Sequence, residues 1–277
     1  MEARIRKDFD VSMKPSKLVV DFGCDLAIGE TRQVVFEDGS GHGGSLRIAR
    51  FDVDDQRVRV RVIDSSHYHA PGSSVRTGEV AASDFAGLVA RSRVALLARP
   101  HLIHIARTDG GMSAFSISTS SNDFHLSLAI RDVDGRVTAR HFTGYAGTRE
   151  QETILPMRFG TEGFTKLLAT LPLAETEPTD DDRRFFSERF VDTMAGNPYW
   201  WVRERYVSLA ARFGTVDVVP ALVTLARQKG DASVARTREK ALATIAAITG
   251  WDPRKADDGS DRTEDEAVTV AAEQCSL

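Results

Sequence analysis

The sequence has few cysteines and no long apolar run. Cys24 and Cys275 lie near opposite ends of the 277-residue chain, which suits a reducing compartment better than a disulfide framework. Because no stretch of about 18 consecutive apolar residues is present, no membrane-spanning helix is expected. Residues 1–14 carry charge throughout and lack the apolar centre of a signal peptide. These absences predict a cytoplasmic protein that has no membrane partner.

The chain also lacks the spacings by which catalytic sites are recognised. It contains no Gly-x-Ser-x-Gly, Cys-x-x-Cys or His-Glu-x-x-His, the patterns typical of a serine nucleophile or a bound zinc ion. A glycine-rich segment, residues 38–44, precedes strand-like residues and ends without a lysine. It is therefore interpreted as a hairpin connection rather than a phosphate-binding loop. The sequence assigns no catalytic, cofactor-binding or metal residues, which favours a protein that is not an enzyme.

Histidine is the residue type that most suggests a metal site, because neutral imidazole is a common ligand. Six of the seven histidines are His67, His69, His101, His104, His125 and His141. The first two would project from one face of a strand, and the last two fall on expected hairpin strands where they can approach each other. No carboxylate spacing accompanies them, so scattered surface histidines are the favoured interpretation. A hydrolase or metalloenzyme that uses these histidines remains an alternative.

The first part of the chain has the patterning of a β-rich domain. The composition, 42% hydrophobic and 27% charged, is that of a globular protein, and the length allows two domains. Valines and arginines alternate over residues 57–62, which predicts a strand with one solvated face. Helices are expected over residues 83–99 and 161–171. The predicted strands are 17–22, 32–36, 45–53, 57–62, 101–107, 112–119, 124–131 and 136–142.

The second part of the chain has helical patterning. Helices are expected at about 181–195, 198–213, 216–229 and 234–249, with a last short helix over 264–274. Gly214, Gly230 and Gly250 are interpreted as helix ends, and Thr179 or Asp180 as a cap at the start of the first helix. The predicted fold class is α+β. Its expected parts are a β-rich domain (1–172), an acidic linker (173–182), a helical domain (183–254) and an acidic tail (255–277).

A repeat marks the helical part. Residues 202–214 recur in altered form at residues 237–249, so that Arg203-Glu204-Arg205 aligns with Arg238-Glu239-Lys240. With residues 218–225 as a first helix, these segments resemble helical-hairpin repeats of the HEAT type, in particular the short bacterial variety. The resemblance covers about 181–254. It implies stacked helix pairs and a tendency to bind other macromolecules, and it implies no reaction.

The helical part is also the basic part. Residues 183–255 hold 13 Lys and Arg against 7 Asp and Glu, whereas residues 173–182 hold 5 acidic residues and residues 256–277 hold 7. Because stacked repeats bring equivalent residues into register, the cations could form a ridge beside two tryptophans. The predicted partner-binding residues are Trp200, Trp201, Arg203, Arg205, Arg236, Arg238 and Lys240. Alternatively, a tryptophan fills a core, the arginines pair with acids such as Glu204 and Glu239, or an acidic segment covers the ridge.

Three functional hypotheses follow from these patterns. The first is an adaptor or regulatory protein without enzymatic activity that binds another protein through its helical-repeat surface. The second is nucleic-acid binding by the basic helical block, which predicts affinity that falls steeply with salt. The third is the hydrolase or metalloenzyme described above. The repeat and the missing catalytic spacings favour the first hypothesis.

Overall fold

The structure, a computed structural model, describes residues 4–5, 20–21, 30–40, 46–65, 73–97, 123–145, 151–196 and 200–274. It belongs to the α+β class, as the sequence predicts. The chain divides into two compact units. The first, the sheet unit, comprises residues 1–69 and 76–175, and the second, the helical unit, comprises residues 70–75 and 176–277. None of the helices in the described segments is long and apolar enough to cross a bilayer.

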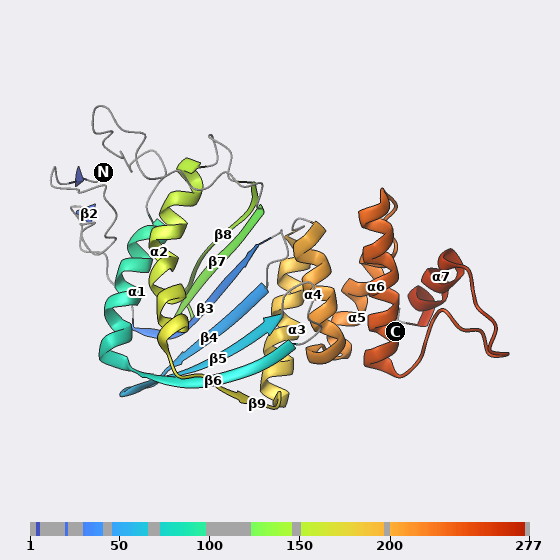
Figure 1. Cartoon of the computed structure of the whole chain (residues 1–277), viewed down its shortest axis with the longest axis horizontal. Helices are drawn as coiled ribbons and strands as arrows, with labels where there is room; N and C mark the ends of the chain where they lie inside the picture. Colours follow the sequence, from blue (N-terminus) through green and yellow to red (C-terminus); the bar gives the residue numbers. More distant parts are fainter. Residues whose placement is uncertain are drawn as a thin grey trace. The chain divides into compact units, whose positions relative to one another are not determined.

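A seven-stranded sheet forms the centre of the sheet unit (Figure 1). Its strands are β3 (Thr31–Ser40), β4 (Leu46–Val53), β5 (Arg57–Ser65), β6 (Ser73–Ala81), β7 (Asp123–Asp132), β8 (Val137–Tyr145) and β9 (Ala174–Thr176). They lie in the order β8-β7-β3-β4-β5-β6-β9. Adjacent strands from β8 through β5 pair antiparallel. A separate two-stranded pair joins β1 (Arg4–Ile5) to β2 (Val20–Asp21).

Two helices, α1 (Ala82–Leu97) and α2 (Gln151–Thr170), lie side by side on one face of the sheet (Figure 1). Side chains alternate between the faces of a strand, so every second residue of the strands points at these helices. Over residues 57–62 of β5 these residues are valines, and the intervening residues are arginines. The helix-covered face therefore carries the core, and the opposite face carries most of the strand's charge.

Four phenylalanines form the centre of that core. Phe36 and Phe51 come from the sheet, Phe85 from α1 and Phe164 from α2, and all four are at most 2% exposed. Their ring centroids lie 5.1 to 5.9 Å apart in stacked, tilted and edge-on arrangements, the separations typical of favourable aromatic pairs. These contacts fasten both helices to the middle strands.

A buried ion pair adds a polar tie between α1 and the sheet. Arg93 of α1 bonds to the Asp132 carboxylate at the end of β7, with Nη1 3.2 Å from Oδ2. Its Nη2 also donates to the Thr31 hydroxyl at the start of β3, 2.8 Å away. Because both charged side chains are almost entirely buried, the pair favours one placement of the helix over others more than it adds net stability.

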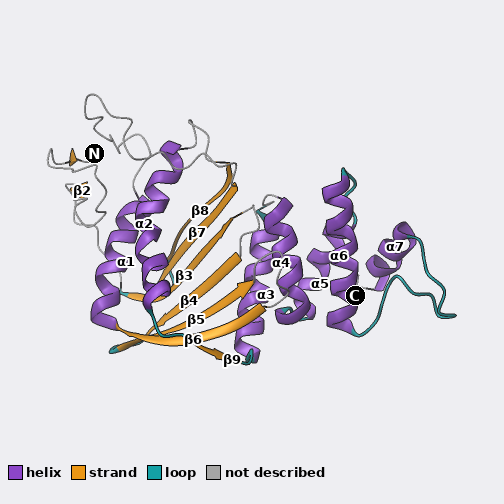
Figure 2. Cartoon of the chain, in the orientation of Figure 1, coloured by secondary structure: helices purple, strands orange, loops and turns teal. Residues whose placement is uncertain are grey.

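The helical unit consists of two helical hairpins and a final helix (Figure 2). Its elements are α3 (Asp180–Ala195), α4 (Trp200–Phe213), the 3₁₀ turn η3 (Val216–Val218), α5 (Val219–Ala226), α6 (Ala232–Thr249) and α7 (Glu264–Gln274). Helix α3 packs against α4, α5 packs against α6, and the second helices α4 and α6 lie beside each other. Helix α7 packs on α5 and α6.

Local sequence signals explain where these helices begin and end. Thr179 and Asp182 form a reciprocal capping box at the start of α3, as the acidic segment predicts. The Asp231 carboxylate accepts from the backbone amides of Ser233 and Val234 and caps α6. At the other end of α6, Gly250 has a φ of 72°, a left-handed conformation that favours glycine.

Several sequence predictions need correction. The predicted acidic linker, residues 173–182, contains β9 and the first turn of α3, and the boundary between the two units falls within it. Strand β6 was not predicted, and α2 begins at Gln151 rather than near residue 161. The helix expected over 216–229 is a short 3₁₀ turn followed by α5, which ends at Ala226, so Gly230 does not end it. The predicted strands 101–107 and 112–119, and residues 41–44 of the glycine-rich segment, lie outside the described residues.

A matched pair of glycines tests the packing of α1 on α2. A Cβ at Gly163 in α2 would lie 2.2 Å from Leu88 Cδ1, whereas one at Gly87 in α1 would meet nothing within 4 Å. We expect Gly163→Ala to lower the free energy of unfolding by roughly 1–3 kcal/mol through overpacking. Gly87→Ala should raise it by about 0.5–1 kcal/mol through helix propensity. Urea unfolding measures both changes, and a stabilised Gly163→Ala variant would contradict this close approach.

Candidate functional site

The two arginines that recur 35 residues apart do the same structural task in the helical unit. Arg203 of α4 donates from Nη1 to Gln228 Oε1, 2.8 Å away, just beyond the end of α5. Arg238 of α6 donates from Nη2 to Asp265 Oδ1 at 2.9 Å in the first turn of α7. Each arginine therefore reaches from the second helix of one hairpin to the next element along the stack. The recurrence in the sequence reflects stacking rather than an exposed ligand-binding row.

Arg238 makes further contacts that hold α7 in place. Its Nε donates to the Ala226 carbonyl at the end of α5, 2.9 Å away, and lies 3.1 Å from Glu264 Oε1. Its side chain is only 13% exposed. The hydrogen bond from Arg238, with Lys229 nearby, holds the pKa of Asp265 below its usual range. Acidic residues of the predicted tail thus cover one of the predicted partner-binding cations.

A buried carboxylate joins the second helices of the two hairpins. The Glu204 side chain on α4 is 7% exposed, and its Oε1 lies 3.7 Å from Arg236 Nε and 3.6 Å from Lys240 Nζ on α6. The Thr244 hydroxyl of α6 donates to the Val207 carbonyl of α4 at 3.2 Å. Although Glu204 and Glu239 occupy equivalent positions in the repeat, Glu239 is exposed. Of the two glutamates, therefore, only Glu204 joins two helices, because α6 supplies the cations near it.

The two tryptophans have different environments. Trp201 is 3% exposed and belongs to the core, whereas Trp200, at the start of α4, is 43% exposed. Arg205 is half-buried and interacts within the structure. The seven predicted residues therefore do not form an open cationic ridge. Whether they bind a partner stays a prediction, and Trp200 presents the largest exposed apolar side chain among them.

The outward face of α4 and α6 carries small side chains. Ser208 and Ala211 are exposed on α4, and the equivalent positions on α6 are Ala243 and Ala246. We call this surface the small-residue face; its members are Ser208, Ala211, Ala243, Ala246 and Ala247, all exposed or half-exposed. Because short side chains keep the helix backbones close to the surface, this face offers a smooth area on which another helix can lie.

The sheet contains a histidine paired with a carboxylate. His125 Nε2 on β7 lies 2.8 Å from Glu37 Oε2 on β3, and the two side chains are 4% and 0% exposed. By register, His141 of β8 stands opposite Ser127, and Ser127 stands opposite Glu37. The two histidines thus lie on the adjacent strands β7 and β8, and their approach to each other stays a prediction. Sequence reasoning did not identify Glu37, whose only local signal is a carboxylate that directly follows the apolar run Val34-Val35-Phe36.

A histidine held by a carboxylate is the arrangement that orients a general base. A base must reach its substrate, however, and the Glu37–His125 pair is enclosed. We therefore assign the pair to the joining of β3 and β7. His67, His69, His101 and His104 lie outside the described residues. In the portion of the chain that the structure describes, no three histidine, cysteine or acidic residues gather as metal ligands would.

Comparison with protein-family models, curated proteins and solved structures finds no match to this chain. The interpretation of its surfaces therefore depends on their own geometry.

Removing the Arg238 side chain tests its task in the stack. We expect Arg238→Ala to speed hydrogen exchange of the α7 backbone amides, because the bonds to Ala226 and Asp265 are lost. Arg184→Ala, which removes a 67%-exposed arginine of α3, serves as the control and should leave α7 unchanged.

Because the pKa of Asp265 is lowered in the folded protein, its carboxylate stabilises the packing of α7 above its unfolded pKa, and this effect is lost as the pH falls through the folded pKa. Unchanged α7 exchange in Arg238→Ala would show that apolar packing alone holds the helix.

A double-mutant cycle tests the Glu37–His125 pair. Glu37→Leu or His125→Leu alone leaves a buried polar partner and should lower the free energy of unfolding by roughly 1–3 kcal/mol. The double variant Glu37→Leu/His125→Leu should cost less than the sum of the two, because neither member of the pair is then left without the other. Additive costs in chemical denaturation would mean that the two side chains contribute independently.

Proposed function

We propose that this protein is a non-enzymatic adaptor or regulatory protein, and that it binds another protein through the small-residue face of its helical unit. The observation that carries the proposal is that some of the recurring residues hold the hairpins together, whereas others are exposed. Arg203 and Arg238, which recur in the repeat, are used in stacking the hairpins. Ser208 and Ala211 on α4 and Ala247 on α6 are small and exposed, beside the exposed Arg212. Stacking alone does not require small residues on the outward side.

The shape of this surface suits a helical or extended segment of a partner. Small side chains let two backbones approach closely, and the 43%-exposed Trp200 at the beginning of α4 supplies the large aromatic contact on which interfaces commonly depend. Stacked helical hairpins of the HEAT type, to which we assign this unit, typically bind macromolecules on the continuous surface that their helices share. The proposed location is the cytoplasm, in keeping with the two distant cysteines.

Contacts of the cations make nucleic-acid binding by the helical block the weaker alternative. Such binding depends on several lysines and arginines that neutralise phosphates. Arg236 and Lys240 lie near Glu204, and Arg238 is covered by Glu264 and Asp265. A phosphate backbone would have to displace these carboxylates, at the cost of the contacts that join the helices.

Site-specific photo-crosslinking in lysate of the source organism tests this function. A photoreactive residue at Ser208 or at Ala247, both on the small-residue face, should capture one and the same protein. A photoreactive residue at Thr224, an exposed position on α5, the first helix of the second hairpin, should not capture that protein. Trp200→Ala should weaken the capture at least several-fold, because the aromatic contact is lost.

The matched control introduces an arginine either on the small-residue face or on α5, the other helix of the same hairpin. Ala247→Arg should abolish binding of the captured protein by steric block, whereas Thr224→Arg should leave its affinity unchanged, as measured by calorimetry with purified proteins. Both positions are exposed, so neither change should affect folding. Equal capture from Thr224 and Ala247, or equal affinity of the two arginine variants, would rule out the small-residue face as the binding surface.

A further inference from the structure

Helix α7 completes the end of the hairpin stack. Arg203 of the first hairpin bonds to Gln228 of the second, and the equivalent arginine of the second hairpin, Arg238, bonds to Asp265 of α7. Helix α7 packs on both helices of the second hairpin, α5 and α6. It therefore occupies the end of the stack, where the repeat would place a further hairpin.

Little apolar surface holds α7 in this place. The side chains that it buries are Ala267, Val268, Ala271 and Ala272. By contrast, α3 at the other end of the unit buries the phenylalanines Phe186 and Phe190. Because the gain from burial scales with the apolar area removed from water, three alanines and a valine contribute much less than two phenylalanines. An element with so few buried apolar atoms opens locally at a lower cost than the rest of its unit.

Charge selects which helix fits this place. Arg238 Nε lies 3.1 Å from Glu264 Oε1, and its Nη2 lies 2.9 Å from Asp265 Oδ1. Lys229 adds a second positive charge near Asp265. The two carboxylates are 44% and 77% exposed, and exposed ion pairs contribute little stability. Such pairs nevertheless favour one partner and one orientation, so this surface favours a helix whose first turn is acidic.

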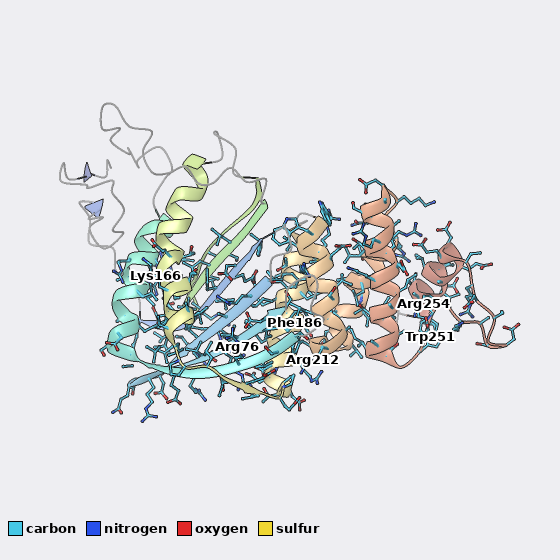
Figure 3. All side chains as sticks on the ribbon, viewed as in Figure 1. Arg76, Lys166, Phe186, Arg212, Trp251 and Arg254 are labelled. Atoms are coloured by element: carbon cyan, nitrogen blue, oxygen red, sulfur yellow. The ribbon has the colours of Figure 1, made fainter. Side chains whose placement is uncertain are left out.

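The connection that leads to α7 is long. Residues 250–263 join α6 to α7, whereas residues 227–231 suffice to join α5 to α6. The side-chain hydrogen bonds of residues 252–262, such as those of Arg254 with Asp252, join these residues to one another (Arg254 is labelled in Figure 3). When extended, a connection of this length reaches roughly 45 Å. Helix α7 can therefore leave its place while α6 stays folded.

The signals that start α7 belong to the helix itself. The backbone amide and the hydroxyl of Thr263 donate to Glu266 Oε2 at 2.8 and 2.7 Å, and the Glu266 amide donates back to the Thr263 hydroxyl at 3.4 Å. This reciprocal capping box needs no residue of α5 or α6. An α7 that has left its place therefore carries its cap with it and can dock on an equivalent surface.

We propose that the surface formed by α5, α6 and Arg238 binds α7 of a second copy of this chain, so that two chains exchange their last helices. The contacts that α7 makes with this surface in its own chain can be made unchanged by the α7 of another copy. Exchange of an identical element is a low-cost route to a dimer. The long connection and the protein concentration then set the balance between the closed chain and the exchanged pair.

Charge reversal tests the exchange in the full chain. One variant, Arg238→Glu, reverses the charge of the surface, and a second, Glu264→Arg/Asp265→Arg, reverses the charge of α7. Within either variant like charges face each other, whereas an exchanged pair of the two variants brings opposite charges together at both contacts. We expect the equimolar mixture to dimerise at least tenfold more tightly than either variant alone, as measured by light scattering during size-exclusion chromatography.

Reversal of an ion pair within one helix is the matched control. Lys166 and Glu162 of α2 pair at 2.6 Å, one helical turn apart. A mixture of Lys166→Glu with Glu162→Lys should dimerise no more tightly than either of these variants alone. Far-UV circular dichroism of Arg238→Glu should retain the helical signal of the other helices. Loss of that signal would overturn the proposal, because α7 would then be inseparable from the rest of the unit.

A peptide in place of the second chain separates the surface from the connection. A labelled peptide of residues 262–274 should bind the Glu264→Arg/Asp265→Arg chain, whose Arg238 is intact, at least tenfold more tightly than the wild-type chain. In the wild type the chain's own α7 competes at a high effective concentration. If the peptide binds but the mixed variants stay monomeric, the surface accepts a helix but not that of a second copy, and the proposal is overturned. Absence of peptide binding overturns it as well. Ala247→Arg should change neither measurement, so the result is independent of the function proposed for the small-residue face.

Discussion

The alternation of side chains along the strands is the constraint on which the sheet unit depends. Phe36 and Phe51 must face α1 and α2 to reach Phe85 and Phe164, and this requirement fixes the face of every other residue in β3 and β4. A slip of one residue in register would bury the arginines and expose the core. The packing of the core thus also determines which residues lie on the opposite face of the sheet.

In the helical unit, electrostatic contacts position helices that apolar packing holds together. Phe186, labelled on α3 in Figure 3, stacks on Tyr206 with ring centroids 5.9 Å apart and secures the first hairpin. Arg203, Glu204 and Arg238 then define how each hairpin meets its neighbour. Charged residues that the sequence suggests as a binding ridge thus form contacts between helices of this unit.

Features set by neighbouring residues could be predicted from the sequence, whereas features set by distant ones could not. The β7–β8 hairpin, α1, α7 and the Thr179 cap each depend on a few adjacent residues. Strand β6 was missed because Arg76 and Gly78 interrupt the apolar alternation that indicates a strand. The sequence offered pairing with acids and cover by an acidic segment only as alternatives to the ridge, because the partners of Arg203 and Arg238, Gln228 and Asp265, lie 25 and 27 residues away. His125 and Glu37 are separated by 88 positions, and no local pattern connects them.

The contact of Arg238 with α7 has a consequence for how a unit of stacked hairpins can change in length. The second hairpin carries both Arg238, which reaches forward to α7, and Gln228, which receives Arg203 from the first hairpin. Duplication of this hairpin in the gene would therefore copy both the arginine that reaches forward and the residue that receives the preceding arginine. A stack built in this way can gain or lose a hairpin without changes to the adjacent hairpins. Each added hairpin would contribute one more second helix to the surface that these helices share.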